Sequence, residues 1–237
     1  MRFGAVITSH GEDELFPGAV ERLRAEADRV VAIENIQGHN EGVADIVNPY
    51  PLSNSENINQ GYRRLVSCDL VIICNSDIII PEGWRAPIEA AFRDPKVGAA
   101  TLPIKGTTRP PGLYPNTPMI FTAIRRSAVT WAGPVDVRMV NGCDDLMLSW
   151  MFYSHNWKQV VVDGPMLIHV GRRTTARLAG LDIHITDSSL PPQEESFLAG
   201  QVAPRSGYYE FCHCFEDERE GAMAYALMVT TDRKLPE

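Results

Sequence analysis

A buried strand that runs directly into a short polar step is the feature that most constrains the fold of this chain. Residues 70–73 are strictly apolar, Asn75-Ser76-Asp77 follows one cysteine later, and residues 78–80 are apolar again. A short apolar run bounded by turn residues is typical of a strand buried inside a sheet. Open α/β sheets bind ligands at the carboxyl ends of such strands. We therefore expect an α/β fold with a ligand site at this step.

Asp77 is the one acidic residue of this step. A carboxylate in this position is suited to hold Mg²⁺ or Mn²⁺ against substrate phosphates, because these cations take a few oxygen ligands from the protein and others from phosphate. The alternative is an ordinary β-turn, since Asn, Ser and Asp side chains all bond their own backbone in turns.

The charge of the chain disfavours a generic surface for polyanions. The formal net charge is −8, which leaves room only for a local basic patch. No apolar run approaches the roughly 20 residues that span a bilayer. Met1-Arg2-Phe3 leads straight into the apolar residues 4–7 without the pattern of a signal peptide. We expect a soluble, cytoplasmic protein.

Strands and helices alternate through the first hundred residues, which is the pattern of a largely parallel sheet. Ser53 and Glu56 form a capping box that opens a helix with Ile58, Tyr62, Leu65 and Val66 at helical spacing. The other elements predicted from such patterns are strands at 3–8, 29–33, 70–75, 97–102, 119–125, 158–162 and 165–170, and helices at 17–27, 86–92, 144–155 and 222–230.

Two segments fall outside this alternation. Residues 105–118 are rich in proline and glycine, and this composition predicts a loop that moves over a site. After Gly171 the periodic signal weakens, and residues 180–204 are polar and rich in turn residues. We expect one core domain, residues 1–175, with residues 176–237 as a C-terminal extension packed on it.

Residues 3–173 resemble the GT-A fold of the family-two glycosyltransferases, which are inverting enzymes with nucleotide-sugar donors. The fold implied is a Rossmann-like, mostly parallel sheet flanked by helices. The first matching piece, residues 6–11, resembles the strand and turn that grip the nucleotide, which implies donor contacts at Ser9 and His10. Glu34 ends the next strand at the place of the acid that holds the base or ribose. The alternative for Glu34 is a solvated loop carboxylate.

The step after the third strand carries the most specific part of the resemblance. Residues 57–61 followed by 69–77 are similar to the family's helix and its metal-binding DxD motif, with Asn75 in the first place and Asp77 in the last. The Pro81-Glu82-Gly83-Trp84 step extends the match. The resemblance implies that Asp77 is a metal ligand and that Asn75 lies at the donor.

An acidic pair, Asp144-Asp145, matches the family's pair at the start of the helix that faces the acceptor. The resemblance implies that Asp145 is the catalytic base and that Asp144 contacts the donor sugar. The alternative is two helix-capping acids, since a helix start favours carboxylates. The family's usual acid at the place of Met147, and the arginine after it, are absent.

Three further residues follow the last predicted strand. His169 matches the histidine that many GT-A enzymes use as a third metal contact, and the alternative is a structural histidine. Arg172 and Arg173 are suited to clamp the donor diphosphate, because arginine binds phosphate bidentately. The sequence does not rank one arginine above the other.

The resemblance implies a metal-dependent inverting glycosyltransferase, a hexosyl- or pentosyltransferase, with Mn²⁺ or Mg²⁺ as cofactor. Family relatives use polysaccharides, lipid-linked sugars, proteins or hydroxymethylated DNA bases as acceptors, and the sequence does not choose among them. One alternative is a catalytically silent nucleotide-sugar-binding protein of the same fold. A nucleotidyltransferase is another, although residues 11–18 are acidic and lack a glycine-rich phosphate loop.

Overall fold

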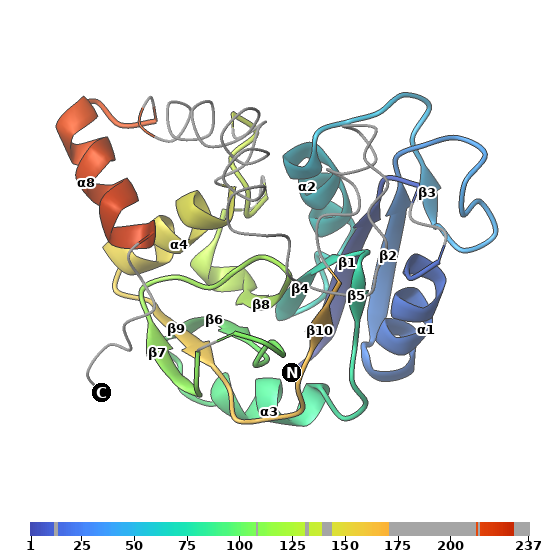
Figure 1. The fold of residues 1–237 in the computed structure, drawn as a ribbon, viewed down its shortest axis with the longest axis horizontal. Coiled ribbons are helices and arrows are strands. Elements are labelled where there is room, and N and C mark those ends of the chain that lie inside the picture. The colour runs from blue at the N-terminus through green and yellow to red at the C-terminus, as the bar shows by residue number, and fades with distance from the viewer. Residues whose placement is uncertain are drawn as a thin grey trace.

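The structure is a computed structural model that describes residues 1–11, 14–107, 109–130, 133–138, 144–170, 212 and 214–229. The elements in these ranges follow the predicted order closely (Figure 1). They are β1 (Phe3–Ser9), α1 (Phe16–Glu26), β2 (Arg29–Glu34), β3 (Ile46–Val47), α2 (Asn54–Arg64), β4 (Leu70–Asn75), β5 (Ile78–Ile79), α3 (Arg85–Ala91), β6 (Val97–Thr101), β7 (Gly112–Tyr114), β8 (Phe121–Arg125), the 3₁₀ turn η1 (Arg126–Ala128), α4 (Asp144–Ser154), β9 (Lys158–Val161), β10 (Ile168–His169) and α8 (Glu218–Val229).

A central sheet has the strand order β3-β2-β1-β4-β8-β6-β9-β7. The pairs of β1 with β2 and β4, β2 with β3, and β6 with β9 are parallel, whereas β8 and β7 run antiparallel to their neighbours. The chain leaves β1 toward β2 on one side and returns to β4 on the other. Such a reversal of strand order is where open α/β sheets bind ligands.

Helices cover both faces of this sheet, as the alternation of side chains in the strands requires. In β4, Ile72 joins a core on the face of α1 and α3, while Val71 joins a second core on the face of α2 and α4. Trp84, just before α3, is fully buried between the rings of Phe3 and Phe121. The expected α/β sheet with flanking helices is confirmed.

The capping box at Ser53 and Glu56 is present as predicted, with reciprocal bonds to the backbone. Val66 was expected on the apolar face of this helix, and that prediction is wrong. The helix ends at Arg64, so Val66 lies beyond it and is 71% exposed. The short strands β3 and β5 were not predicted, because two-residue strands carry no periodic signal.

The proline-rich segment 105–118 was predicted to be a loop without regular structure, and the structure corrects this. It contains β7, which pairs antiparallel with β9. Tyr114, Asn116 and Thr117 are buried, and Thr117 Oγ1 donates to Gln159 Oε1 at 3.3 Å. Residues 105–107, at the start of the segment, are exposed. The second half is therefore part of the sheet edge.

Helix α8 packs on α4, and the two lie side by side in Figure 1. Met147 of α4 and Ala224 of α8 share a small apolar cluster with Cys212. The amide of Asn116 also donates to the carbonyl of Met228. The predicted boundary between residues 175 and 176 lies outside the described residues and stays a prediction.

Gly61 of α2 packs directly on the sheet, and we expect Gly61→Ala to destabilise the fold. A Cβ at this position would lie 2.5 Å from Cγ1 of Val6, which is fully buried in β1. Overpacking of this kind costs about 1–3 kcal/mol. A lower midpoint of urea unfolding, with an unchanged m-value, would show this loss of stability.

Gly18→Ala in α1 is the matched control. Nothing lies within 4 Å of a Cβ at Gly18, which is exposed. Alanine has less backbone freedom than glycine in the unfolded chain, so this substitution within a helix stabilises the fold by about 0.5–1 kcal/mol. Equal urea midpoints for the Gly61 variant and the wild type would contradict the close approach of α2 to β1.

Candidate functional site

The carboxyl ends of β1, β2 and β4 bring three of the predicted donor-binding residues to one edge of the sheet. Ser9 is the register partner of Glu34, and Thr8 is the partner of Asn75. Ser9 and Glu34 are buried, whereas Asn75 is partly exposed. The parallel register thus places these residues in one row at the point where the strand order reverses.

Glu34 is fully buried, so its alternative interpretation as a solvated loop carboxylate is wrong. Its Oε1 accepts backbone N–H bonds from Gly11, Asn35 and Ile36 at 2.8–2.9 Å. Its Oε2 accepts a bond of 2.7 Å from the amide of Asn40. Glu34 therefore fixes the turn after β1 against the end of β2, which shapes this edge of the sheet.

His10 is fixed at the same edge by a neighbouring amide. Asn35 Nδ2 lies 3.0 Å from His10 Nδ1 and also donates to the carbonyl of Leu52 at 2.7 Å. The amide oxygen of Asn35 accepts from the backbone of Leu52 at 2.9 Å. Both ends of the Asn35 amide are thus used to join the loop after β1 to the segment before α2.

Asp77 and His169 lie together, although they are far apart in the sequence. Strands β5 and β10 pair antiparallel and run side by side in Figure 1, with His169 opposite Ile78. The backbone N–H of Val170 donates to the carbonyl of Asp77 at 3.0 Å. As a result, His169 Nε2 lies 3.3 Å from Asp77 Oδ1.

The ligand atoms of Asp77 and His169 are spaced as two neighbouring ligands of a divalent cation would be. Neighbouring ligands of an octahedral Mg²⁺ site, each about 2.1 Å from the ion, are about 3 Å apart. The 3.3 Å between Asp77 Oδ1 and His169 Nε2 is close to that separation. No group of three or more His, Cys, Asp or Glu side chains suited to a metal occurs among the described residues. A cation here would need phosphate or water for its remaining ligands.

Asp144 and Asp145 form the first turn of α4, as predicted. Each carboxylate accepts the backbone N–H of the next residue, at 3.0 Å for Asp144 and 2.8 Å for Asp145. Asp144 also accepts a hydrogen bond of 3.0 Å from the side-chain amide of Asn54. The amide oxygen of Asn54 in turn accepts a hydrogen bond of 3.2 Å from Thr8 Oγ1. The capping interpretation is therefore correct in part, and Asp144 is in addition connected to the end of β1.

Both acids are harder to ionise than a carboxyl group in water. Burial, followed by repulsion from Asp144, raises the pKa of Asp145 to about 7. Burial also raises the pKa of Asp144, and the hydrogen bond from Asn54 opposes that rise. A carboxyl group with a pKa near neutrality, placed in a cavity, is a candidate for proton transfer.

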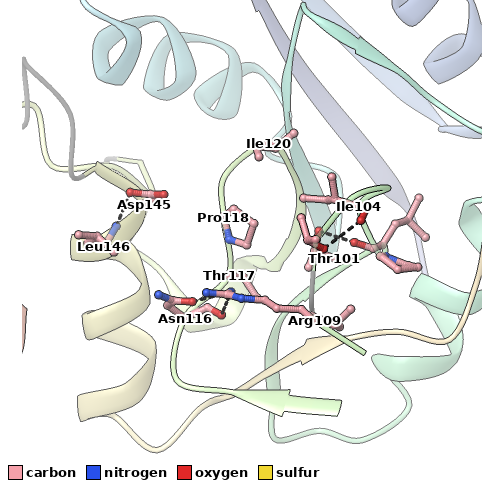
Figure 2. A pocket seen from close by; sticks show the side chains of 13 residues that line it. Thr101, Ile104, Arg109, Asn116, Thr117, Pro118, Ile120, Asp145 and Leu146 are labelled. Atoms are coloured by element: carbon pink, nitrogen blue, oxygen red, sulfur yellow. Dashed lines mark hydrogen bonds between the residues drawn. The ribbon is translucent and has the colours of Figure 1, made fainter. Parts of the chain in front are cut away.

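Asp145 lines a cavity of about 260 Å³ between α4, the end of β6 and the proline-rich segment. Figure 2 shows Asp145 on one side of this cavity and Arg109 on the other. Among the residues that the structure describes, the others that line the cavity are neutral, and they are Thr101, Leu102, Pro103, Ile104, Thr107, Asn116, Thr117, Pro118, Ile120, Leu146 and Val161. The cavity thus combines apolar walls with a small number of polar groups, which is typical of ligand sites.

Solved structures with a similar arrangement of elements include glycosyltransferases. GalNAc-T7 with UDP, GalNAc and Mn²⁺ matches with a TM-score of 0.58 and 12% identity, over 71% of this chain and 44% of that chain. Residues 1–349 of TarS from S. aureus, with UDP, match with a TM-score of 0.55 and 11% identity, over 97% of this chain and 71% of that chain. This chain has the GT-A fold.

A third GT-A structure with a comparable match is glucosyl-3-phosphoglycerate synthase from Mycobacterium tuberculosis, in complex with phosphoglyceric acid. It has a TM-score of 0.54 and 11% identity, over 85% of this chain and 77% of that chain. No protein-family model and no curated protein sequence matches this chain significantly. Among its described residues, no helix is long and apolar enough to cross a membrane.

Two residues of the candidate site were not indicated by the sequence. Asn54 was overlooked because Ser53 and Glu56 account for the helix start, yet its amide reaches Asp144. Arg109 was overlooked within a segment expected to be irregular. Arg172 and Arg173, which were predicted to bind the donor, lie outside the described residues.

Proposed function

We propose that this chain is a metal-dependent inverting glycosyltransferase that moves a sugar from a nucleotide-sugar donor to an acceptor hydroxyl. The observation that carries the proposal is the Asp145 carboxyl, which lines a cavity of a GT-A fold and has a pKa raised to about 7. The structural neighbours are glycosyltransferases, and two of them were solved with UDP. Asp77, two residues beyond the end of β4, and His169, in the separate two-stranded sheet of β5 and β10, support a diphosphate site.

In the proposed reaction, Asp145 accepts the proton of the acceptor hydroxyl. The acceptor oxygen forms a bond to the anomeric carbon as the bond from that carbon to the diphosphate oxygen breaks, and the electron pair leaves with the nucleoside diphosphate. Attack from the face opposite the leaving group inverts the anomeric centre. Mn²⁺ or Mg²⁺ held by Asp77 and His169 would neutralise charge on the departing diphosphate.

The donor side is assigned to the row at the ends of β1, β2 and β4. Glu34 holds the turn after β1 in place, so that Ser9 and His10 are fixed before a nucleotide binds. Asn75 borders this row from β4. In this proposal Asp144, which Asn54 holds between β1 and α4, accepts a hydroxyl of the donor sugar.

A screen of nucleotide sugars tests the proposed function. The thermal stability of the protein is measured with each nucleotide sugar, in the presence and absence of MnCl₂. Hydrolysis of the nucleotide sugars that bind is followed by mass spectrometry. We expect a subset to raise Tm only with manganese and to be slowly hydrolysed by water. Failure of every nucleotide sugar to bind would contradict the proposal. Binding without any turnover, even with a broad acceptor mixture, would instead favour a silent binding protein.

The rate of transfer is expected to rise with pH through a midpoint near 7. Asp145 acts as a base only when ionised, and its pKa is raised to about 7 by burial and by Asp144, while Arg109 opposes the rise. Asp144→Asn removes the like charge, so the midpoint should move to lower pH. The pH dependence of kcat/KM for both proteins measures it. An unchanged midpoint would contradict the coupling of the two carboxyl groups.

A further inference from the structure

The cavity beside Asp145 has a second charged group, which the proposed reaction does not use. Among the described residues that line it, Arg109 is the one cation and Asp145 the one acid. In the view of Figure 2 these side chains enter from opposite sides, Asp145 from the start of α4 and Arg109 from the proline-rich segment. The chain as a whole is acidic, with a net charge of −8, so the positive charge of Arg109 in this cavity is opposite in sign to that of the whole chain.

Arg109 is held in place before any ligand binds. Its Nη1 donates to Asn116 Oδ1 at 2.7 Å and to the Asn116 carbonyl at 3.3 Å. The guanidinium also lies 5.4 Å from the ring centre of Tyr114, whose hydroxyl donates to the carbonyl of Pro110 at 2.7 Å.

The supports of Arg109 are themselves fixed. Tyr114 and Asn116 are buried, and the amide of Asn116 donates to the carbonyl of Met228 in α8. A guanidinium held in this way loses little further side-chain freedom when it binds an anion.

We propose that the acceptor is a small hydroxylated anion, with its carboxylate or phosphate group at Arg109 and its reacting hydroxyl at Asp145. This inference rests on the proposed function. Guanidinium groups bind carboxylate and phosphate through charge-assisted, often bidentate hydrogen bonds. The two groups of opposite charge orient such a molecule, because its anionic end is attracted by Arg109 and repelled by ionised Asp145.

The size of the cavity supports a small acceptor. Its volume of about 260 Å³ is below the roughly 300–1,000 Å³ of sites that hold drug-sized ligands. Within the described part of the chain, its walls, which include Pro118, Ile120 and Leu146, offer no second cation for a longer polyanion. A three-carbon hydroxy acid or phosphorylated polyol is of suitable size.

Three acceptors of similar size test the inference: glycerol, glycerate and glycerol phosphate. Each is offered with the nucleotide sugar and manganese that give turnover in the donor screen. We expect glycerate or glycerol phosphate to exceed glycerol by about 10- to 100-fold in kcat/KM, as charged hydrogen bonds allow. The comparison of the two anions identifies which group the site takes. Equal use of glycerol would overturn the inference.

Arg109→Gln is expected to remove this preference. The variant should use the anions no better than glycerol. The measured quantity is the ratio of kcat/KM for each anion to kcat/KM for glycerol, because Arg109 also lowers the pKa of Asp145 and its loss changes the rate with every acceptor. Lys105→Gln is the matched control, since Lys105 is an exposed cation of the same segment that does not line the cavity. It should keep the preference. An equal loss with all three acceptors in the Arg109 variant would mean that Arg109 is only structural.

Direct binding provides a second measurement that does not depend on turnover. Calorimetry should find glycerol phosphate or glycerate bound at least about 10-fold more weakly by Arg109→Gln than by the wild type. Equal binding by both proteins overturns the inference. Donor hydrolysis distinguishes the two failures: if the donor is hydrolysed and anions are not preferred, only the acceptor class is wrong. If no nucleotide sugar binds, the proposed function and this inference both fail.

Discussion

Asp145→Asn is expected to lower the rate of glycosyl transfer by about 10²- to 10⁴-fold, the usual contribution of a general base. The amide has the size of the carboxylate but does not accept the acceptor's proton. Its oxygen can still accept the backbone N–H of Leu146, so the start of α4 is expected to keep its geometry. Single-turnover transfer with saturating donor and acceptor measures the effect.

Donor binding provides the control for this variant. Asp145→Asn should bind the nucleotide sugar and manganese with wild-type affinity, because donor binding does not require the base. Asp144→Asn should instead change the donor KM first, since Asp144 is connected through Asn54 to the end of β1. If Asp144→Asn abolishes transfer and Asp145→Asn does not, the roles of the two acids are exchanged. If both variants are fully active, the pair only caps the helix.

Asp145→Asn is also expected to change the stability of the fold, in the opposite sense to its effect on the rate. The pKa of Asp145 is raised in the folded protein, so its protonated form contributes stability that is lost as pH rises from the usual Asp value through about 7. The amide that replaces this carboxyl group has no such proton to lose, so Asp145→Asn should be at least as stable as the wild type at about pH 8. A group kept ionisable for catalysis at a cost in stability is common at active sites.

The central part of the fold could be predicted from the sequence because its signals are local. The apolar run at 70–73 has residues facing both cores, and it is buried on both faces as such a run predicts. Ser53 and Glu56 make a helix start that depends on only four consecutive residues. The acidic pair at Asp144 likewise begins α4 as expected.

The rest of the site depends on contacts between distant segments, which local patterns do not encode. The pairing of β5 with β10 that brings His169 to Asp77 involves two residues on each strand. Glu34 resembles a surface loop acid in sequence, but the turn after β1 folds over it and donates to it. Arg109 is visible in the sequence, whereas its place in a cavity follows from the attachment of Asn116 to α8.

Asp77→Asn is expected to abolish the manganese-dependent gain in affinity for a nucleoside diphosphate. An amide is a much weaker ligand for a hard cation than a carboxylate, and the described residues offer no third acidic or histidine ligand to replace it. The loss should exceed the 10- to 100-fold that is usual when a group supporting a metal ligand is removed, so we expect more than about 100-fold. Calorimetry with UDP or another diphosphate of the accepted donor, with and without MnCl₂, measures it.

The fold is expected to survive this change, which makes the measurement interpretable. The pairing of β5 with β10 uses the backbone carbonyl of Asp77 and the N–H of Val170, and neither is altered. Glu82→Gln is the matched control, because it removes one exposed negative charge a short way further along the chain. It should leave manganese-dependent binding unchanged, which separates ligation from a general loss of negative charge.

His169→Ala should weaken manganese-dependent binding less than Asp77→Asn does, by about 10- to 100-fold. An imidazole that binds a metal ion is a neutral ligand, and His169 is the more exposed of the two side chains. Asp77 provides the negative charge that attracts the cation. If His169→Ala titrates with manganese as the wild type does, His169 only hydrogen-bonds Asp77 and is not a ligand. If Asp77→Asn also binds diphosphate and manganese normally, the polar step after β4 is a turn, and the cation, if one is used, is held elsewhere.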